Sequence, residues 1–220
     1  MTVRRTLAAA VVASALALGG WVAPLRAQDA RLSAIPDADA RAAVGAIIVE
    51  AEGRGLPREP LVTKALEGVQ KGAPGERIEA AVRAMVGRLL VARDALAPTA
   101  SPAELDAAAG ALAAGVTADA IRVVRLAAPS RSITVALGVL AQLTVRGVPA
   151  ARAAQAVATL VQRGASHAQL LSMQREVQDD LAAGVPPSTA LDLRFRAVIA
   201  ALPPPAPAPI GRTAVPTSKP

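Results

Sequence analysis

The 220-residue chain contains no cysteine and no tyrosine, and it has a single histidine. Without cysteine there are no disulfides, no thiolate metal ligands and no lipid attached to a cysteine side chain. With His167 as the only imidazole, neither a metal site of nitrogen and sulfur ligands nor a Ser-His-Asp triad is indicated. The sequence therefore predicts no catalytic residue, no metal ligand and no cofactor-binding residue.

Aromatic side chains are nearly missing as well, because Trp21 and Phe195 are the only two. Proteins that bind single-stranded nucleic acids stack bases on aromatic rings, so we expect no nucleic acid partner. In place of aromatics the chain has many alanines, which supply much of its 53% hydrophobic content. Since alanine buries little area per residue, we expect a core in which backbones approach closely.

The N-terminal residues have the organisation of a secretory signal peptide. Arg4 and Arg5 precede an uncharged run of 20 residues, 6–25, and the small Ala27 ends the segment 1–27. An uncleaved membrane anchor is the alternative, because a run of about 20 apolar residues is long enough to span a bilayer. We expect an exported protein, periplasmic or secreted, which contacts the membrane only through this segment if it is not cleaved.

Residues 28–35 are interpreted as a short polar leader, followed by a helical domain over 36–202. Within that domain Val82, Met85 and Leu89 recur at intervals of three and four residues, which is typical of an amphipathic helix with one face on a core. No stretch shows the alternation of a convincing strand. The sequence predicts an all-α fold.

Glycine and proline punctuate this domain at related positions. The stretch GLPREPLVTKALEGVQKGA from Gly55 and the stretch GVPAARAAQAVATLVQRGA from Gly147 each place a second glycine 17 residues after the first. Similar starts follow at Gly115 and Gly184. A glycine in a left-handed conformation can end one helix while a proline presets the first turn of the next. The spacing predicts an array of short helical hairpins, solenoid-like, with an irregular helical bundle as the alternative.

The composition changes abruptly at the C-terminal end. Residues 203–220 contain seven prolines among 18 residues, which excludes a helix and favours an extended polyproline-type conformation. We interpret this segment as a disordered proline-rich tail. The alternative is a spacer, or a ligand for a proline-binding groove.

One stretch of the chain contains arginines but no acidic residues, although the formal net charge of the whole chain is only +7. Between residues 121 and 163 there are six arginines and no acidic residue. Arg146 and Arg163 precede glycines, where a cation suits the negative end of a helix dipole. The remaining four are predicted contacts for an anionic ligand, with a solvated basic face as the alternative. They are Arg122, Arg125, Arg131 and Arg152.

The stretch GLPREPLVTKALEGVQKGAP, together with the later RGVP and GVPP steps, resembles a pattern in uncharacterised secreted bacterial proteins with alanine-rich helical bodies. The resemblance covers roughly residues 55–202. It implies an exported helical protein, and since that family has no established activity, it assigns a role to no residue.

Three functions remain as hypotheses. The first is an exported, non-catalytic interaction or scaffold protein of the cell envelope, whose partner is unknown. The second is a binding protein for an anionic ligand or surface, through the basic segment 122–163. The third is an enzyme that uses carboxylates alone. Oligomeric state and the identity of the partner or ligand are not indicated by the sequence.

Overall fold

The computed structural model describes residues 29–203, so the predicted signal peptide and nearly all of the predicted tail lie outside the described residues. None of the described residues is in a strand, and the all-α prediction is confirmed. The described elements are η1 (Ala30–Ala34), α1 (Ala38–Gly53), α2 (Arg58–Gln70), α3 (Gly75–Leu96), α4 (Pro102–Ala113), α5 (Ala118–Ala127), α6 (Thr134–Val145), α7 (Ala150–Gln162), α8 (His167–Ala182) and α9 (Pro187–Ala201).

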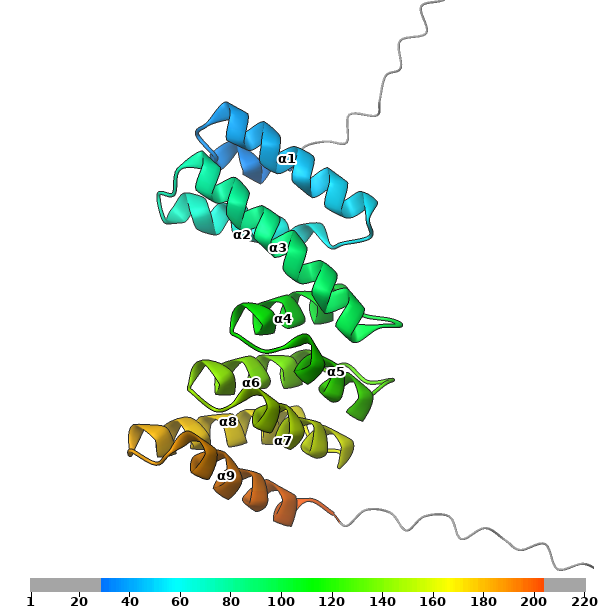
Figure 1. The fold of residues 1–220 in the computed structure, drawn as a ribbon, viewed down its shortest axis with the longest axis vertical. Coiled ribbons are helices and arrows are strands. Elements are labelled where there is room, and N and C mark those ends of the chain that lie inside the picture. The colour runs from blue at the N-terminus through cyan, green and yellow to red at the C-terminus, as the bar shows by residue number, and fades with distance from the viewer. Residues whose placement is uncertain (1–28, 204–220) are drawn as a thin grey trace, which may run out of the picture.

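The helices stack in chain order along the long axis of the molecule (Figure 1). On one side α4 packs on α6 and α6 on α8; on the other, α3 packs on α5, α5 on α7 and α7 on α9. Contacts within the α6–α7 and α8–α9 hairpins join the two sides. The long helix α3 also contacts α1, α2 and α4, so it connects the N-terminal helices to the rest of the stack.

Six connections in the described part of the chain use the same turn. In each, a glycine with φ between +64° and +91° ends the helix, and its N–H donates to a carbonyl three residues earlier. The N–H of the next residue donates to a carbonyl five residues earlier, as when the Val148 N–H donates to the Leu143 carbonyl at 3.1 Å. This is the Schellman motif, which pairs the last carbonyls of a helix. The glycines are Gly55, Gly72, Gly115, Gly147, Gly164 and Gly184.

The residue after each such turn is the N-cap of the following helix. It is proline in four cases, with φ between −69° and −55°, and threonine or serine in the other two. The sequence pattern placed these prolines at the starts of helices, and the structure places them at the N-cap. The extended backbone of an N-cap has a φ that proline adopts without strain.

Alanine forms much of the core, as expected from the composition. On α4 the side chains of Ala108, Ala109 and Ala111 are fully buried, and α6 adds the buried Leu137 and Leu140. Small side chains on α4 allow the backbones of its neighbours to come near. The larger leucines of α6 fill the space between α4, α7 and α8.

The segment interpreted as a polar leader is packed from Asp29 onwards. Leu32 and Ile35 are buried in the common core. Arg31 donates to Asp29 at 2.8 Å and to Glu59 at the start of α2 at 2.7 Å. Residues 29–35, upstream of the expected domain start, therefore belong to the same packed body as α1 and α2.

Candidate functional site

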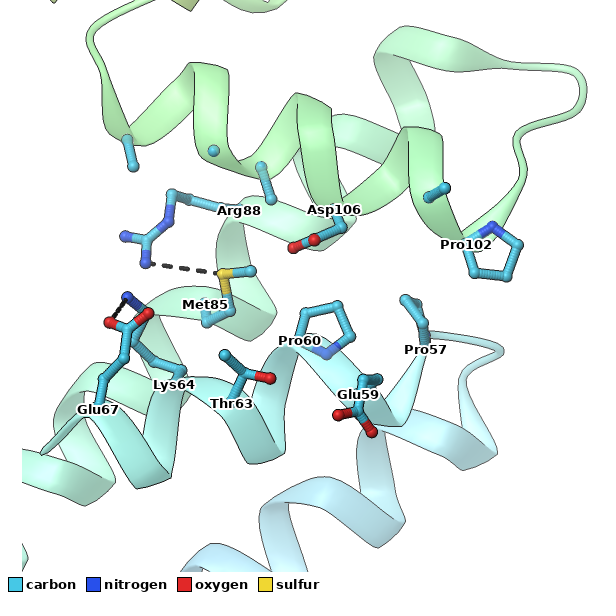
Figure 2. A pocket seen from close by; sticks show the side chains of 14 residues that line it. Pro57, Glu59, Pro60, Thr63, Lys64, Glu67, Met85, Arg88, Pro102 and Asp106 are labelled. Carbon is cyan, nitrogen blue, oxygen red and sulfur yellow. Dashed lines mark hydrogen bonds and ion pairs between the residues drawn. The ribbon is translucent and has the colours of Figure 1, made fainter. Parts of the chain in front are cut away.

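A groove of about 450 Å³ separates α2 from α4, and α3 forms its inner wall (Figure 2). Figure 2 shows Pro57 and Pro60 of the α2 side below the groove, with Pro102 of α4 opposite. Met85, which is buried on α3, adds an apolar side chain to the wall. The groove follows from the stacking, because α3 supports both helices and leaves the space between them open.

Small residues on α4 keep this space open. Ala103, Ala109, Gly110 and Ala113 all line the groove. A Cβ atom added at Gly110 would meet no other atom within 4 Å, and this glycine does not have a positive φ. Neither a turn nor a close approach requires glycine here, although glycine in a helix interior costs about 1 kcal/mol relative to alanine. The residue leaves a gap in the groove wall and forms no packing contact there.

Two of the three carboxylates that line the groove are paired with cations. Glu67 accepts a hydrogen bond from Lys64, three residues earlier on α2, at 2.6 Å. Glu59 binds Arg31 at 2.7 Å. In both cases the hydrogen bond from the cation lowers the pKa of the carboxyl. These four side chains balance one another's charge.

The third carboxylate, Asp106 of α4, has no hydrogen bond or ion pair within the described residues. Its side chain extends into the space between α4 and α2 in Figure 2 and is exposed to solvent. The groove walls partly desolvate this carboxyl and raise its pKa, against the opposing effect of the Lys64 charge. Asp106 is therefore an available acceptor in the groove.

The groove also contains a cation without an acidic partner in the described part of the chain, Arg88 of α3. Its Nε is buried and has no hydrogen-bond partner. One terminal nitrogen contacts only the Sδ of Met85, at 3.8 Å. The buried Nε is closed to a ligand, but because a thioether is a weak acceptor, the terminal nitrogens of the guanidinium retain donors on the groove wall.

Together these features describe a binding groove with apolar walls, a free acceptor and free donors. A general acid and base pair would need a second available carboxylate beside Asp106, and the other two are held by cations. Residues 29–203 contain no group of three His, Asp or Glu side chains placed to hold a metal ion. The geometry is suited to recognising a ligand that has both donors and acceptors.

The four arginines predicted as anion contacts lie outside this groove, on α5, α7 and the α5–α6 loop. Arg122 pairs with Asp119 one turn earlier on α5, and both side chains are exposed. Arg152 of α7 binds Asp192 of α9, with a 3.2 Å hydrogen bond from its Nε. These two arginines form surface ion pairs, which screen part of their charge.

Arg125 is buried, with 8% of its side chain exposed, and it pairs with the equally buried Glu104 of α4. Its Nη1 also donates to the carbonyls of Ala128 and Arg131, each at 3.2 Å. Burial acts to raise the pKa of Glu104, but backbone hydrogen bonds and Arg125 outweigh it and lower that pKa. We call this pair, Glu104 with Arg125, the latch, since it fixes the α5–α6 loop to α4.

Arg131 lies in that loop and donates to the Val161 carbonyl at the end of α7. Arg125 and Arg131 both line a second, polar pocket of about 440 Å³. Its other lining residues include the hydroxyl-bearing Thr99, Ser101, Ser130 and Ser132. The structure thus brings two of the four predicted arginines to one pocket and leaves Arg122 and Arg152 away from it.

The groove residues were not singled out from the sequence. The available signal was local: Asp106 is the single acid in the stretch DAAAGALAAG, and Gly110 stands one turn after it without ending a helix. A lone acid and an interior glycine at four-residue spacing share one helix face. That face opens onto a groove only because α2 lies opposite, which the pattern does not indicate.

No family model, curated protein or solved structure matches the chain. Across residues 29–203, the helices are too short or too polar to cross a membrane. Any function is therefore argued from the groove and the polar pocket themselves.

Proposed function

We propose that the protein is an exported, non-catalytic interaction module of the cell envelope, and that its α2–α4 groove receives a segment of another protein. The observation that supports this most is that Asp106 of α4 and Arg88 of α3 line the groove beside apolar surfaces, and neither has an ion-pair partner within the described residues. Peptide segments supply N–H donors, C=O acceptors and apolar side chains together, so they satisfy all parts of such a groove.

The size and rigidity of the groove support the proposal. Ligand sites in proteins commonly have volumes of roughly 300–1,000 Å³, and this groove has about 450 Å³. Its walls are held by α3, whose Leu89 is fully buried, and by the latch on the opposite face of α4. A groove that is already formed requires little ordering when a ligand binds.

A blocked groove tests this function. Gly110→Leu places a large side chain in the groove, whereas Gly138→Leu adds the same side chain at an exposed, equally open position of α6. Wild type and both variants are used to capture proteins from an extract of the cell envelope. A protein found with wild type and Gly138→Leu but not with Gly110→Leu is then purified and titrated against all three.

The proposal predicts a loss of affinity of at least tenfold for Gly110→Leu and none for Gly138→Leu. Circular dichroism checks that both variants remain folded. Equal affinity of the purified partner for the three proteins would place its binding site elsewhere and contradict the groove as the functional site.

A second candidate function is binding of an anionic ligand in the polar pocket. The observation that favours it is the position of Arg131 beside four hydroxyl-bearing residues in one pocket, in which Arg125 is paired with Glu104, another lining residue. Guanidinium groups and hydroxyls together suit phosphate or carboxylate oxygens. Inorganic phosphate is the probe, with Arg131→Gln as the test variant and Arg122→Gln as the control.

Phosphate binding that weakens with salt and is lost only in Arg131→Gln would support this candidate. Equal binding by Arg131→Gln and wild type would reject it.

A further inference from the structure

We propose that the segment bound in the α2–α4 groove presents a lysine or arginine side chain to Asp106. This inference rests on the proposed function and adds the chemistry of the partner. It follows from the difference between Asp106 and the other carboxylates of the groove, Glu59 and Glu67, which already have cations.

The position of Asp106 favours a cation as its partner. Its carboxylate has no partner in the described part of the chain, and the walls of the groove withdraw part of its hydration. An ammonium or guanidinium group brought beside it would form a charge-assisted hydrogen bond, which is stronger than a bond between neutral groups.

The nearby positive charges do not oppose this placement strongly. Lys64 is neutralised by Glu67 at 2.6 Å. Arg88 forms no ion pair with Asp106, and Figure 2 shows the two side chains coming from different walls, α3 and α4. The incoming cation therefore meets a carboxylate whose charge is not cancelled by a direct contact.

Arg88 indicates a peptide rather than a free cation. A backbone carbonyl would give its guanidinium a strong acceptor in place of the Met85 sulfur at 3.8 Å. Pro57, Pro60 and Pro102 provide apolar surface for the side chains beside the cation. A hard metal ion is a poor fit, since Ca²⁺ takes six to eight oxygen ligands and one carboxylate is available here.

A random 12-residue peptide library tests the inference directly. Peptides are selected on the wild-type protein after removal of those that bind Gly110→Leu. The expected peptides contain a lysine or arginine next to small apolar residues. Synthetic peptides are then titrated against wild type, Asp106→Asn and Asp179→Asn. Asp179 is the matched control, because it is an exposed aspartate on α8 that does not line the groove.

We expect Asp106→Asn to weaken binding at least tenfold and Asp179→Asn to leave it unchanged. Binding should also weaken as the pH falls through the pKa of Asp106, since the cation binds the ionised carboxylate. The other charged groups that line the groove are Glu59, Lys64 and Glu67 of α2 and Arg88 of α3. Asp106→Asn should remove the part of the pH dependence that belongs to Asp106.

The outcomes separate the two levels of the proposal. If no wild-type binder remains after the peptides that bind Gly110→Leu are removed, the groove is not a peptide site and the proposed function fails. If peptides are lost in Gly110→Leu but bind Asp106→Asn as tightly as wild type, the groove function stands and the cation is rejected. Selected peptides without a basic residue would reject the cation as well.

Discussion

Two acidic residues of α4, Glu104 and Asp106, are two positions apart and are used in opposite ways. Two residues along a helix correspond to a rotation of about 200°, so the two side chains leave α4 on opposite faces. Glu104 is buried and fully engaged by Arg125 and by backbone N–H groups, at 3.1 Å from Ile133 and 3.0 Å from Ser101. Asp106 faces the groove without a partner.

Each acid also has an arginine on a neighbouring helix, and these differ in the same way. Arg125 of α5 binds Glu104 and three carbonyls, whereas Arg88 of α3 has only the Met85 thioether as an acceptor. The Nε of each arginine is buried without a hydrogen bond. The comparison shows that the buried charge of α4, on Glu104, has a full set of hydrogen-bond partners that join α4 to the α5–α6 loop. On the other face of the same helix, Asp106 is exposed to solvent and has no partner in the described part of the chain, so it is available to another molecule.

The largest expected effect comes from breaking the latch. Arg125→Met leaves Glu104 buried without its cation, and we expect a loss of about 3–5 kcal/mol of unfolding free energy. Arg88→Met should cost no more than about 1 kcal/mol, because it removes no ion pair. Urea unfolding followed by circular dichroism measures both. If Arg125→Met lost no more unfolding free energy than Arg88→Met, the proposed difference between the buried and groove-facing sides of α4 would be contradicted.

A smaller effect of opposite sign is expected on the groove face. Gly110→Ala should stabilise the protein by about 1 kcal/mol, since it improves helix propensity and its Cβ meets no neighbour. Gly147→Ala is the contrasting control, because Gly147 has a φ of +88° and an L-residue there is strained by about 1–2 kcal/mol. Thermal unfolding compares the two. Destabilisation by Gly110→Ala would mean that the groove face is packed for stability.

The smallest effect concerns pH. Because the pKa of Glu104 is lowered in the folded protein, its contribution to stability is present above the unfolded pKa and is lost as the pH falls through the folded one. The pKa of Asp106 is raised, so protonation in acid favours the folded state slightly. Glu104→Gln should therefore reduce the acid sensitivity of unfolding, and Asp106→Asn should increase it. Urea unfolding at several pH values measures how steeply the free energy of unfolding depends on pH in each protein. If both variants changed this dependence in the same direction relative to wild type, the assignment would be contradicted.

The helix ends could be predicted from the sequence because their causes are local. A glycine such as Gly147 and the proline two residues later determine a turn through their own backbone preferences. The packing of Ile35 was missed, because a short polar segment gives no periodic signal.

The candidate site depends on contacts between distant residues, which explains why the sequence did not indicate it. Arg125 stood out as one member of a basic run, but its partner Glu104 lies 21 residues earlier on another helix. The groove needs α2 to lie opposite α4, and that arrangement is set by the length and packing of α3. The prediction of anion contacts at Arg122 and Arg152 stays a prediction, as both arginines are occupied by surface ion pairs.

The most direct test of the central claim is a double-mutant cycle across the groove. A selected peptide and its version with the basic residue changed to alanine are titrated against wild type and Asp106→Asn. Direct contact between Asp106 and the cation predicts that either change weakens binding at least tenfold and that the second change then adds little. Fully additive effects, with no coupling between the two positions, would contradict the account.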